Sequence, residues 1–383
     1  MLILGIETSC DETAAAVVRD GREILSNVVV SQIDIFAEYG GVIPEVAARS
    51  HLEAMLPVVD KALIEAGCSW KEIDAIAVTH APGLLGSLLI GTLTARTLAI
   101  LHEKPLYAVH HLKSHVYANW LTTLEASKHT FRDRKSSRPS LRGSASYVLG
   151  SNLRKFPQSD FSELQTPQFP LLALVVSGGH TQILYMREHN QFEIVGTTHD
   201  DAVGECFDKV AKILGLPYPG GPAIAKAAAS GDALRYNLPR PKVEGLDFSF
   251  SGLKTAVLRA VQKEVGVPIS YPSHKLAELL SEQQVCDFAA SFQRTAVMIL
   301  CEKISAALRK YPDVQSVVVA GGVSANKALR EAMAEAYFPE PSLSGDNGAM
   351  VAAACYYEIL AGVRPVDPYA LNIYPRVSIE TEG

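Results

Sequence analysis

Runs of apolar residues separated by turn-forming residues predict that the chain opens with a group of β-strands. In the N-terminal part these predicted strands are Leu2–Glu7, Thr13–Arg19, Glu23–Val30, Ile73–Thr79 and Leu106–Val109. Apolar residues that recur at helical spacing predict a long helix from about Pro44 to Ala66 and another helix that ends near Leu101. Pro44 suits the first turn of a helix, where its missing N–H would have no partner.

The same order of patterns begins again at Leu171. The strands predicted here are Leu171–Val176, Thr181–Arg187, Phe192–Thr198 and, further on, Ser316–Ala320. The predicted helices are Gly204–Leu214, Gly221–Ala229, Gln284–Lys310, Asn326–Ala336 and about Gly348–Gly362. Two halves that each begin with three strands and continue with α/β units indicate a duplicated α/β fold. Such proteins usually hold their ligand in the cleft between the halves, outside the strand ends.

The length of 383 residues exceeds what one hydrophobic core usually supports, so we expect two lobes. We place the N-terminal lobe at 1–120 together with about 346–375, and the C-terminal lobe at 170–345. Between them, residues 121–169 form a basic insertion. Its basic residues are Lys128, Arg132, Arg134, Lys135, Arg138, Arg142, Arg154 and Lys155. This composition favours a loop, which is either a solvated surface insertion or an electrostatic arm for a phosphate backbone.

Composition narrows the class of protein. A net charge of -6 and a pI near 6.0 exclude a surface that is basic throughout, but they leave room for a local basic patch. The six cysteines are scattered without a Cys-x-x-Cys pair, as in proteins with reduced thiols. The N-terminus lacks a signal-type sequence, and the longest apolar segment, Leu84 to Leu101, is interrupted by glycine and arginine. We therefore expect a cytoplasmic protein without a membrane span.

His111 and His115 are the most informative pair of residues. Four positions apart on a helix, their imidazoles project from one face and suit the ligation of one metal ion. In a chain with 11 histidines such a pair also arises easily by chance. A zinc peptidase needs a glutamate directly after the first histidine, and Leu112 stands there instead. Asp346, in the turn before the last helix, would complete a His/His/Asp set for zinc or ferrous iron, and a plain helix cap is its competing role.

Polar or glycine-rich turns follow strands in both halves. They lie at 8–12, 177–181, 219–222, 321–326 and 345–348. Backbone N–H groups in such turns can donate hydrogen bonds to phosphate oxygens. Each turn alone is equally consistent with an ordinary hairpin or helix start. Asn326 is either a helix cap or a group that binds a sugar or base. Asp200, Asp201, Glu205 and Asp208 are expected to be charges at a helix start, and Asp208 has the further option of a ribose hydroxyl.

Several ordered motifs resemble one known family. They are Gly5 to Thr13, Ser177 to Thr181, Phe207 to Lys209 with Tyr218 to Pro222, Phe248 to Lys254, Gly321 to Asn326 and Asp346 to Ala349. These stretches look like the Kae1/TsaD/Qri7 family of tRNA threonylcarbamoyladenosine transferases, in its bacterial form. The resemblance covers nearly all of the chain except about 122–168. It implies the duplicated actin/Hsp70-like ATPase (ASKHA) fold, with two lobes and a ligand cleft between them.

The resemblance also implies an activity and its site. The activity would be transfer of L-threonylcarbamoyl from its adenylate to N6 of adenosine 37 in tRNAs that read codons beginning with A. His111, His115 and Asp346 would hold one divalent metal ion, with Fe²⁺ favoured and Zn²⁺ as the alternative. The adenine nucleotide (threonylcarbamoyl-AMP, ATP or ADP) would be bound by Val175, Val176, Ser177, Gly178, Gly179, Asp208, Gly221 and Asn326. Asp11, Glu12 and His180 are expected to help with proton handling, without a choice of general base.

The resemblance implies partners as well. Besides tRNA, bacterial relatives act with a TsaB-like paralogue and a TsaE-like ATPase, and a homodimer is a further option. One departure is Leu112-Lys113-Ser114 between the histidines, where the family commonly has Met-Glu-Gly or a close variant. We expect Lys113 either to tune the metal site or to face tRNA. Three alternative functions stay open at this stage, namely a small-molecule carbamoyltransferase, an ATP-driven binding module and, least favoured because of Leu112, a metalloprotease.

Overall fold

Two β-sheets form the framework of the molecule. The computed structural model describes residues 1–123 and 166–380. The first sheet has the strand order β5-β4-β1-β2-β3-β6, and the second has the order β10-β7-β8-β9. The strands of the first sheet are β1 (Leu2–Glu7), β2 (Glu12–Arg19), β3 (Glu23–Ser31), β4 (Ala75–Ala81), β5 (Leu106–His110) and β6 (Thr122–Thr123). Those of the second are β7 (Leu171–Val176), β8 (Thr181–Met186), β9 (Phe192–Thr197) and β10 (Ser316–Ala320).

The pairing of strands repeats from one sheet to the other. In the first sheet β1 pairs antiparallel with β2 and parallel with β4, and β2 pairs antiparallel with β3. In the second, β7 pairs antiparallel with β8 and parallel with β10, and β8 pairs antiparallel with β9. The predicted duplication is thereby confirmed, and the chain has the duplicated actin/Hsp70-like fold.

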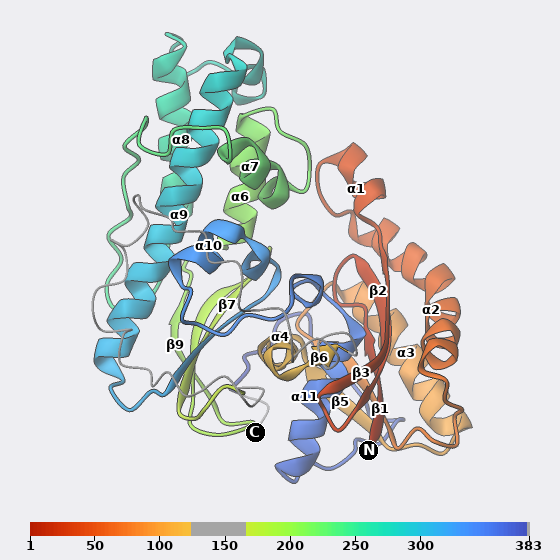
Figure 1. Cartoon of the computed structure of the whole chain (residues 1–383). Helices are drawn as coiled ribbons and strands as arrows, with labels where there is room; N and C mark the ends of the chain where they lie inside the picture. The colour runs from red at the N-terminus through yellow and green to blue at the C-terminus, as the bar shows by residue number, and fades with distance from the viewer. Residues whose placement is uncertain (124–165, 381–383) are drawn as a thin grey trace, which may run out of the picture.

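The helices lie in three layers around these sheets (Figure 1). Their bounds are α1 (Ile33–Tyr39), α2 (Pro44–Ala66), α3 (Leu85–Leu101), α4 (His111–Tyr117), α6 (Val203–Ile213), α7 (Gly220–Ala228), α8 (Ser251–Glu264), α9 (Glu282–Lys310), α10 (Lys327–Ala332) and α11 (Gly348–Leu360). Short 3-10 turns lie at Ala118–Trp120, Ser273–Lys275, Ala277–Leu279, Gly322–Ala325 and Pro341–Leu343. Helices α2 and α3 cover one face of the first sheet, and α9 packs on the outer face of the second, with α6 beside it and α8 against α6 and α9.

Helices α4 and α11 lie between the two sheets (Figure 1). The alternation of side chains along β7 explains why both of its faces are covered. Leu172 and Leu174 point into the core shared with α6 and α9, whereas Leu171 and Ala173 point into the central core with α4 and α11. The first turn of α4 and the turn before α11 therefore meet in the middle of the molecule.

Most predicted elements agree with the structure, with three differences. The helix predicted at Asn326–Ala336 is shorter, because α10 ends at Ala332. Helices α1 and α8 were not predicted, although the apolar positions Leu253, Val257 and Val261 of α8 recur every fourth residue and are buried. The basic residues of the insertion lie in 124–165, outside the described residues. The lobe boundaries remain a prediction.

Two sequence expectations about the chain as a whole can be compared with the structure. All six cysteines are free thiols, as their scattered positions predict. Among the helices of the described residues, none has both the length and the apolar character that a membrane crossing requires.

Candidate metal centre

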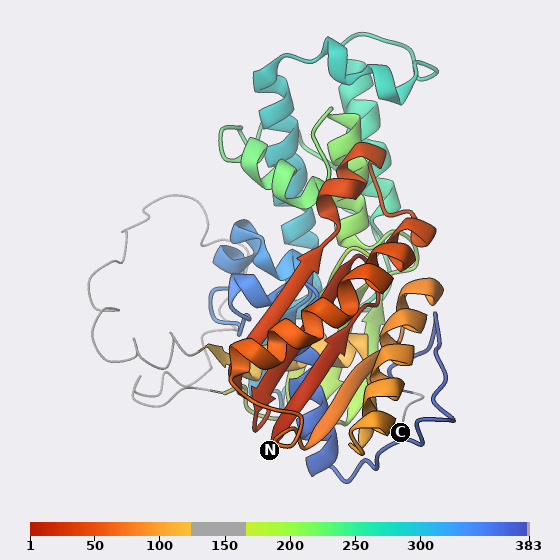
Figure 2. The same cartoon turned by 90° about the vertical axis from the view of Figure 1, so that its right-hand side faces the viewer.

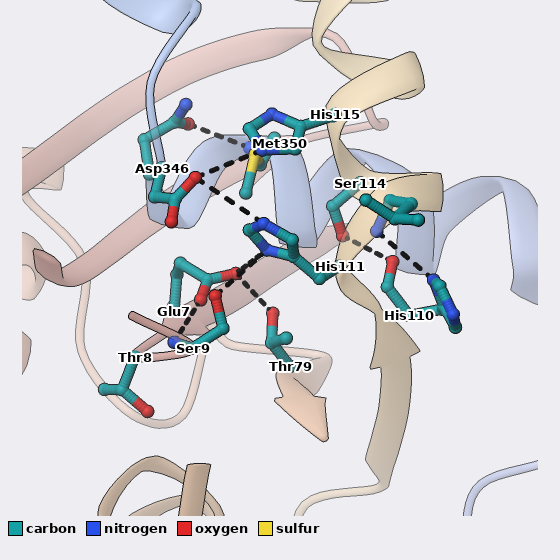
Figure 3. A network of polar contacts seen from close by, with 12 residues as sticks. Glu7, Thr8, Ser9, Thr79, His110, His111, Ser114, His115, Asp346 and Met350 are labelled. Carbon is teal, nitrogen blue, oxygen red and sulfur yellow. Dashed lines mark hydrogen bonds and ion pairs between the residues drawn. The ribbon is translucent and has the colours of Figure 1, made fainter. Parts of the chain in front are cut away.

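The two histidines occupy the first turns of a short helix that follows β5 directly. His110, the last residue of β5, caps α4 because its ring Nδ1 accepts a hydrogen bond from the Leu112 N–H at 3.2 Å. His111 and His115 consequently lie one turn apart on α4 and face the same way, as the spacing predicts (Figure 3). Both rings are buried, His115 almost completely.

Asp346 reaches these rings from the turn before α11. Its Oδ1 lies 3.1 Å from His115 Nε2 and 3.6 Å from His111 Nε2. The competing role as a helix cap belongs to the next residue, since the Asn347 side chain accepts a hydrogen bond from the Met350 N–H at 3.0 Å. The Asp346 carboxylate is thus left to the two histidines.

The arrangement fits a divalent cation. One ligand atom each from His111, His115 and Asp346 lies within 4.8 Å of the others. Both ring nitrogens of His115 are buried, and within the described residues the close polar contact of Nε2 is the Asp346 carboxylate itself, at 3.1 Å. A buried imidazole nitrogen that faces a carboxylate suits a shared metal ion at the point where the three ligand atoms converge.

The charges at the site support the same interpretation. Burial lowers the pKa of His111, but the charges of Asp346 and Glu7 outweigh it and raise that pKa to about 9. Burial raises the pKa of Asp346, and the positive charges of the histidines outweigh it, lowering the pKa to about 2. The carboxylates therefore stay ionised and attract positive charge to this point.

Glu7 supports His111 from the other side (Figure 3). It is fully buried at the end of β1, and its Oε2 lies 3.1 Å from His111 Nδ1. Thr79 Oγ1 donates to the same carboxylate at 2.6 Å, and the Ser9 N–H donates at 2.5 Å. A metal-bound histidine commonly donates its other N–H to a carboxylate in this way. This role of Glu7 was not predicted from the sequence, although an acid at the end of an apolar strand is a visible signal.

Lys113 lies on the far side of α4 from the metal ligands. Lys113 is only 4% exposed, and its Nζ lies 5.8 Å from the centre of the Phe192 ring in β9. The expectation that Lys113 faces tRNA is therefore wrong. Two residues along a helix from His111, a side chain points away from the face that the histidines share.

The turn between β7 and β8 is the glycine turn nearest to the centre. The Ser177 N–H donates to the His180 carbonyl at 2.9 Å, and the Ser177 hydroxyl accepts from the His180 N–H at 3.1 Å. A Cβ on Gly178 or Gly179 would meet nothing within 4 Å, so their backbones are open to a ligand. Val175 and Val176 end β7 and are fully buried, which leaves their backbone as the part next to the turn.

The remaining predicted nucleotide residues make helix contacts. The Asp208 carboxylate accepts from the Gly220 N–H at 2.7 Å, at the start of α7, and burial raises its pKa. Gly221 follows there with open space above its Cα. Asn326 caps α10 by accepting from the Leu329 N–H at 3.1 Å and also donates to Gln293 at 2.8 Å. The capping role considered for Asn326 is therefore confirmed.

Asp200 caps a helix other than the one expected. Its carboxylate accepts hydrogen bonds from the Phe250 and Ser251 N–H groups and from the hydroxyls of Ser249 and Ser251, at the start of α8. The family-like motif at 248–254 is thereby tied to the loop before α6. The helix-start prediction for Asp200 was right in kind and wrong in the helix.

Glu12 and His180 have shifted pKa values. Burial, followed by the charges of Asp346 and Asp11, raises the pKa of Glu12 to about 10. Burial, followed by the charges of His111 and His115, lowers the pKa of His180 to about 4. At neutral pH, Glu12 is therefore protonated and His180 is neutral.

Comparison with known proteins identifies the family. The family model of TsaD, tRNA N6-adenosine threonylcarbamoyltransferase, matches residues 23–129 and 158–353. The chain belongs to the TsaD family. A relative of that name from Thermomicrobium roseum is 46% identical over 377 residues, which cover 95% of this chain and 93% of the relative. Another, from Symbiobacterium thermophilum, is 47% identical over 392 residues, covering 100% of this chain and 98% of the relative.

A solved structure gives a weaker likeness. The (R)-2-hydroxyglutaryl-CoA dehydratase component A of Acidaminococcus fermentans aligns with 94% of this chain and 99% of its own, at 14% identity and a TM-score of 0.45. The TsaD family, in contrast, is matched along both halves of the chain, including the stretch with the two histidines.

Proposed function

We propose that this TsaD-family transferase moves L-threonylcarbamoyl from threonylcarbamoyl-AMP to N6 of adenosine 37 in tRNAs that read codons beginning with A. The family membership supports the activity on tRNA. The observation that carries the metal-assisted part is the convergence of His111, His115 and Asp346 in a buried site. Fe²⁺ is the favoured ion and Zn²⁺ the alternative, since two imidazoles and one carboxylate suit both.

The residues of the chain would divide the work of the reaction. The bound ion would act as a Lewis acid toward oxygen atoms of the donor. Glu7 holds the His111 ring so that Nε2 faces the site. Neutral His180 offers a nitrogen to the proton that the attacking amine loses, and protonated Glu12 offers a hydrogen bond to the donor. Asp11, beside Glu12, completes the proposed set of proton-handling groups.

The adenylate would lie along the glycine turns of the second half. Gly178 and Gly179 leave space beside their backbone for phosphate oxygens, and Gly221 has open space above its Cα at the start of α7. Val175, Val176 and Ser177 lead into the first of these turns. Asp208 and Asn326 keep their helix contacts and would offer their remaining polar atoms to the nucleoside.

The outer face of the first lobe would bind a protein partner. Helices α2 and α3 pack side by side (Figure 2). They expose apolar side chains on the face turned away from the sheet. These exposed residues are Leu52, Leu56, Ile64, Leu85, Leu89 and Leu93. An exposed apolar face of this kind marks an interaction site. We assign this face to a TsaB-like paralogue, and a TsaE-like ATPase would be a further subunit. A measurement of the molecular mass in solution would reveal the alternative, a homodimer. Since the tRNA substrate is cytoplasmic, the protein would act in the cytoplasm.

One assay tests the proposed function. The protein, alone and with TsaB-like and TsaE-like partners, is incubated with Fe²⁺ or Zn²⁺, threonylcarbamoyl-AMP and an unmodified tRNA that reads codons beginning with A. The tRNA is then digested to nucleosides, and we expect threonylcarbamoyladenosine at position 37. No modified adenosine under any condition would refute the proposal. Modification of a small acceptor in place of tRNA would favour the alternative, a small-molecule carbamoyltransferase.

A further inference from the structure

A cavity of about 530 Å³ lies beside His180. It is lined by Pro82 and Gly83 after β4, by His180 itself, and by Pro375 to Ser378 near the C-terminal end. Its volume falls in the range of about 300–1,000 Å³ that is usual for small-ligand pockets. Because the charges of His111 and His115 act on His180, the cavity adjoins the candidate metal centre.

The C-terminal segment that walls this cavity is fixed to the first half of the chain. The Tyr374 N–H donates to the His80 carbonyl at 3.0 Å, and the Gly83 N–H donates to the Pro375 carbonyl at 3.3 Å. His110 Nε2 lies 3.4 Å from the carbonyl oxygen of Val377. These contacts hold the backbone on both sides of Arg376.

The end of the same segment is fixed to the second half. Ile379 is buried in the central core, and the Glu380 carboxylate accepts a hydrogen bond from the Ile194 N–H of β9 at 2.7 Å. After α11 the chain first runs along the outside of the first lobe (Figure 2). Residues 372–380 therefore cross from one lobe to the other, and the cavity lies under the crossing.

Arg376 gives the cavity its charge. Among the described residues that line it, Arg376 is the one with a permanent charge. The Arg376 side chain is exposed, and no carboxylate in the described part of the chain pairs with it. A guanidinium group binds a carboxylate through two parallel hydrogen bonds, and its planar shape makes that geometry specific.

We propose that this cavity receives the threonylcarbamoyl group and that Arg376 binds its carboxylate. This inference rests on the function proposed above, because that group carries a free carboxylate at the end opposite to the reacting carbonyl. The carboxylate is anionic at neutral pH and needs a cation outside the metal centre. The cavity supplies one next to His180, on a segment held from both lobes.

A binding measurement with a fragment of the donor tests the assignment without turnover. N-carbamoyl-L-threonine is titrated by calorimetry into the full-length wild-type protein and into Arg376→Gln. N-carbamoyl-L-threoninamide, which lacks the carboxylate, serves as the matched ligand. We expect Arg376→Gln to weaken binding of the acid by about tenfold or more and to leave binding of the amide unchanged. Equal affinity of wild type and variant for the acid, or no binding of the acid to wild type, would overturn the proposal.

Steady-state kinetics with the complete system show whether Arg376 binds the carboxylate of the donor or a phosphate of the tRNA. Arg376→Gln should raise the KM for threonylcarbamoyl-AMP and leave the KM for tRNA unchanged. A raised KM for tRNA alone would mean that Arg376 binds a tRNA phosphate, and the proposal would be wrong. Arg376→Lys keeps the charge, and its KM for threonylcarbamoyl-AMP should lie between the values of wild type and Arg376→Gln. Arg364→Gln, at an exposed arginine between α11 and this segment, is the control and should match wild type.

The outcome that would refute the role of Arg376 differs from the outcome that would refute the proposed function. If wild type forms no modified adenosine, the proposed function is refuted, whatever Arg376 binds. If wild type is active and Arg376→Gln has an unchanged donor KM, the proposed function stands and the role of Arg376 is refuted. Thermal unfolding of each variant shows whether the fold is intact, and at this exposed position we expect no change.

Discussion

Glu7 Oε2 and His111 Nδ1 lie 3.1 Å apart in the buried centre of the molecule. The carboxylate belongs to the first strand of the chain, and the imidazole to the helix that follows the last long strand of the first sheet. Burial opposes ionisation of Glu7, but the charge of His111 and its hydrogen bond lower the pKa of the carboxyl. The pair fixes which nitrogen of His111 is turned toward His115 and Asp346.

Glu7→Gln should weaken metal binding without unfolding the protein. The amide keeps the shape of the side chain but loses the charge that orients and polarises His111. We expect a loss of metal affinity of about 10–100-fold, measured by competition with a chromogenic chelator. Glu53→Gln, at an exposed acid of α2, is the matched control. An unchanged affinity in Glu7→Gln would show that Glu7 is only a core contact.

His111→Ala and Asp346→Ala should each lose both bound metal and product. Removal of one ligand from a three-ligand site leaves too few donors to hold the ion. Metal content by elemental analysis and threonylcarbamoyladenosine by nucleoside analysis check this. His199→Ala, at an exposed histidine, should keep both. Metal retained in both ligand variants would contradict the assignment.

The sequence predicted the duplicated fold and one half of the metal centre from local patterns. The strands at Leu2–Glu7 and Leu171–Val176 were predicted with the bounds that they have. The spacing of His111 and His115 is also a local property. Asp346 is far from them in the sequence, so local patterns offered it as the third ligand only beside a competing role as a helix cap, and the family resemblance favoured the ligand role.

Contacts between distant segments could not be predicted. Nothing in the sequence near Asp200 indicates that its partner is the start of α8, because the hydrogen bonds depend on how the segments fold together. The choice of Asn347 over Asp346 as the cap of α11 is equally invisible, since both residue types are good caps. The crossing of residues 372–380 between the lobes depends on tertiary contacts of a segment with no regular pattern.

Lys113→Glu should destabilise the protein and leave the metal site intact. Lys113 is buried and lines a pocket of about 160 Å³ together with Glu358, so the variant would place a second carboxylate beside that residue. Reversal of a buried charge typically costs about 3 kcal/mol of unfolding free energy, measurable by urea denaturation. Lys61→Glu, at an exposed lysine, should lower the free energy of unfolding much less. A loss of metal affinity with unchanged stability would show that Lys113 acts on the metal site after all.

Asp200→Asn should remove a pH-dependent part of the stability. Burial raises the pKa of Asp200, but hydrogen bonds from Ser249, Ser251 and Phe250 outweigh it and lower the pKa below its usual value of 3.8. A carboxyl with a lowered pKa in the folded state stabilises the protein above its unfolded pKa, and this contribution is lost as the pH falls through the folded pKa. Because Asp200 is exposed, we expect a cost of about 1 kcal/mol at pH 7.

The difference in the free energy of unfolding between wild type and Asp200→Asn should therefore have its full value at pH 7. It should become smaller as the pH falls below 3.8. Urea unfolding at a series of pH values measures it. Asp60→Asn, at an exposed aspartate of α2, is the control and should show no such pH-dependent difference. If the Asp200→Asn difference stayed constant down to the acid transition, the carboxylate would not be the group that holds the start of α8 to the loop before α6. The hydroxyls of Ser249 and Ser251 would then be the groups to substitute next.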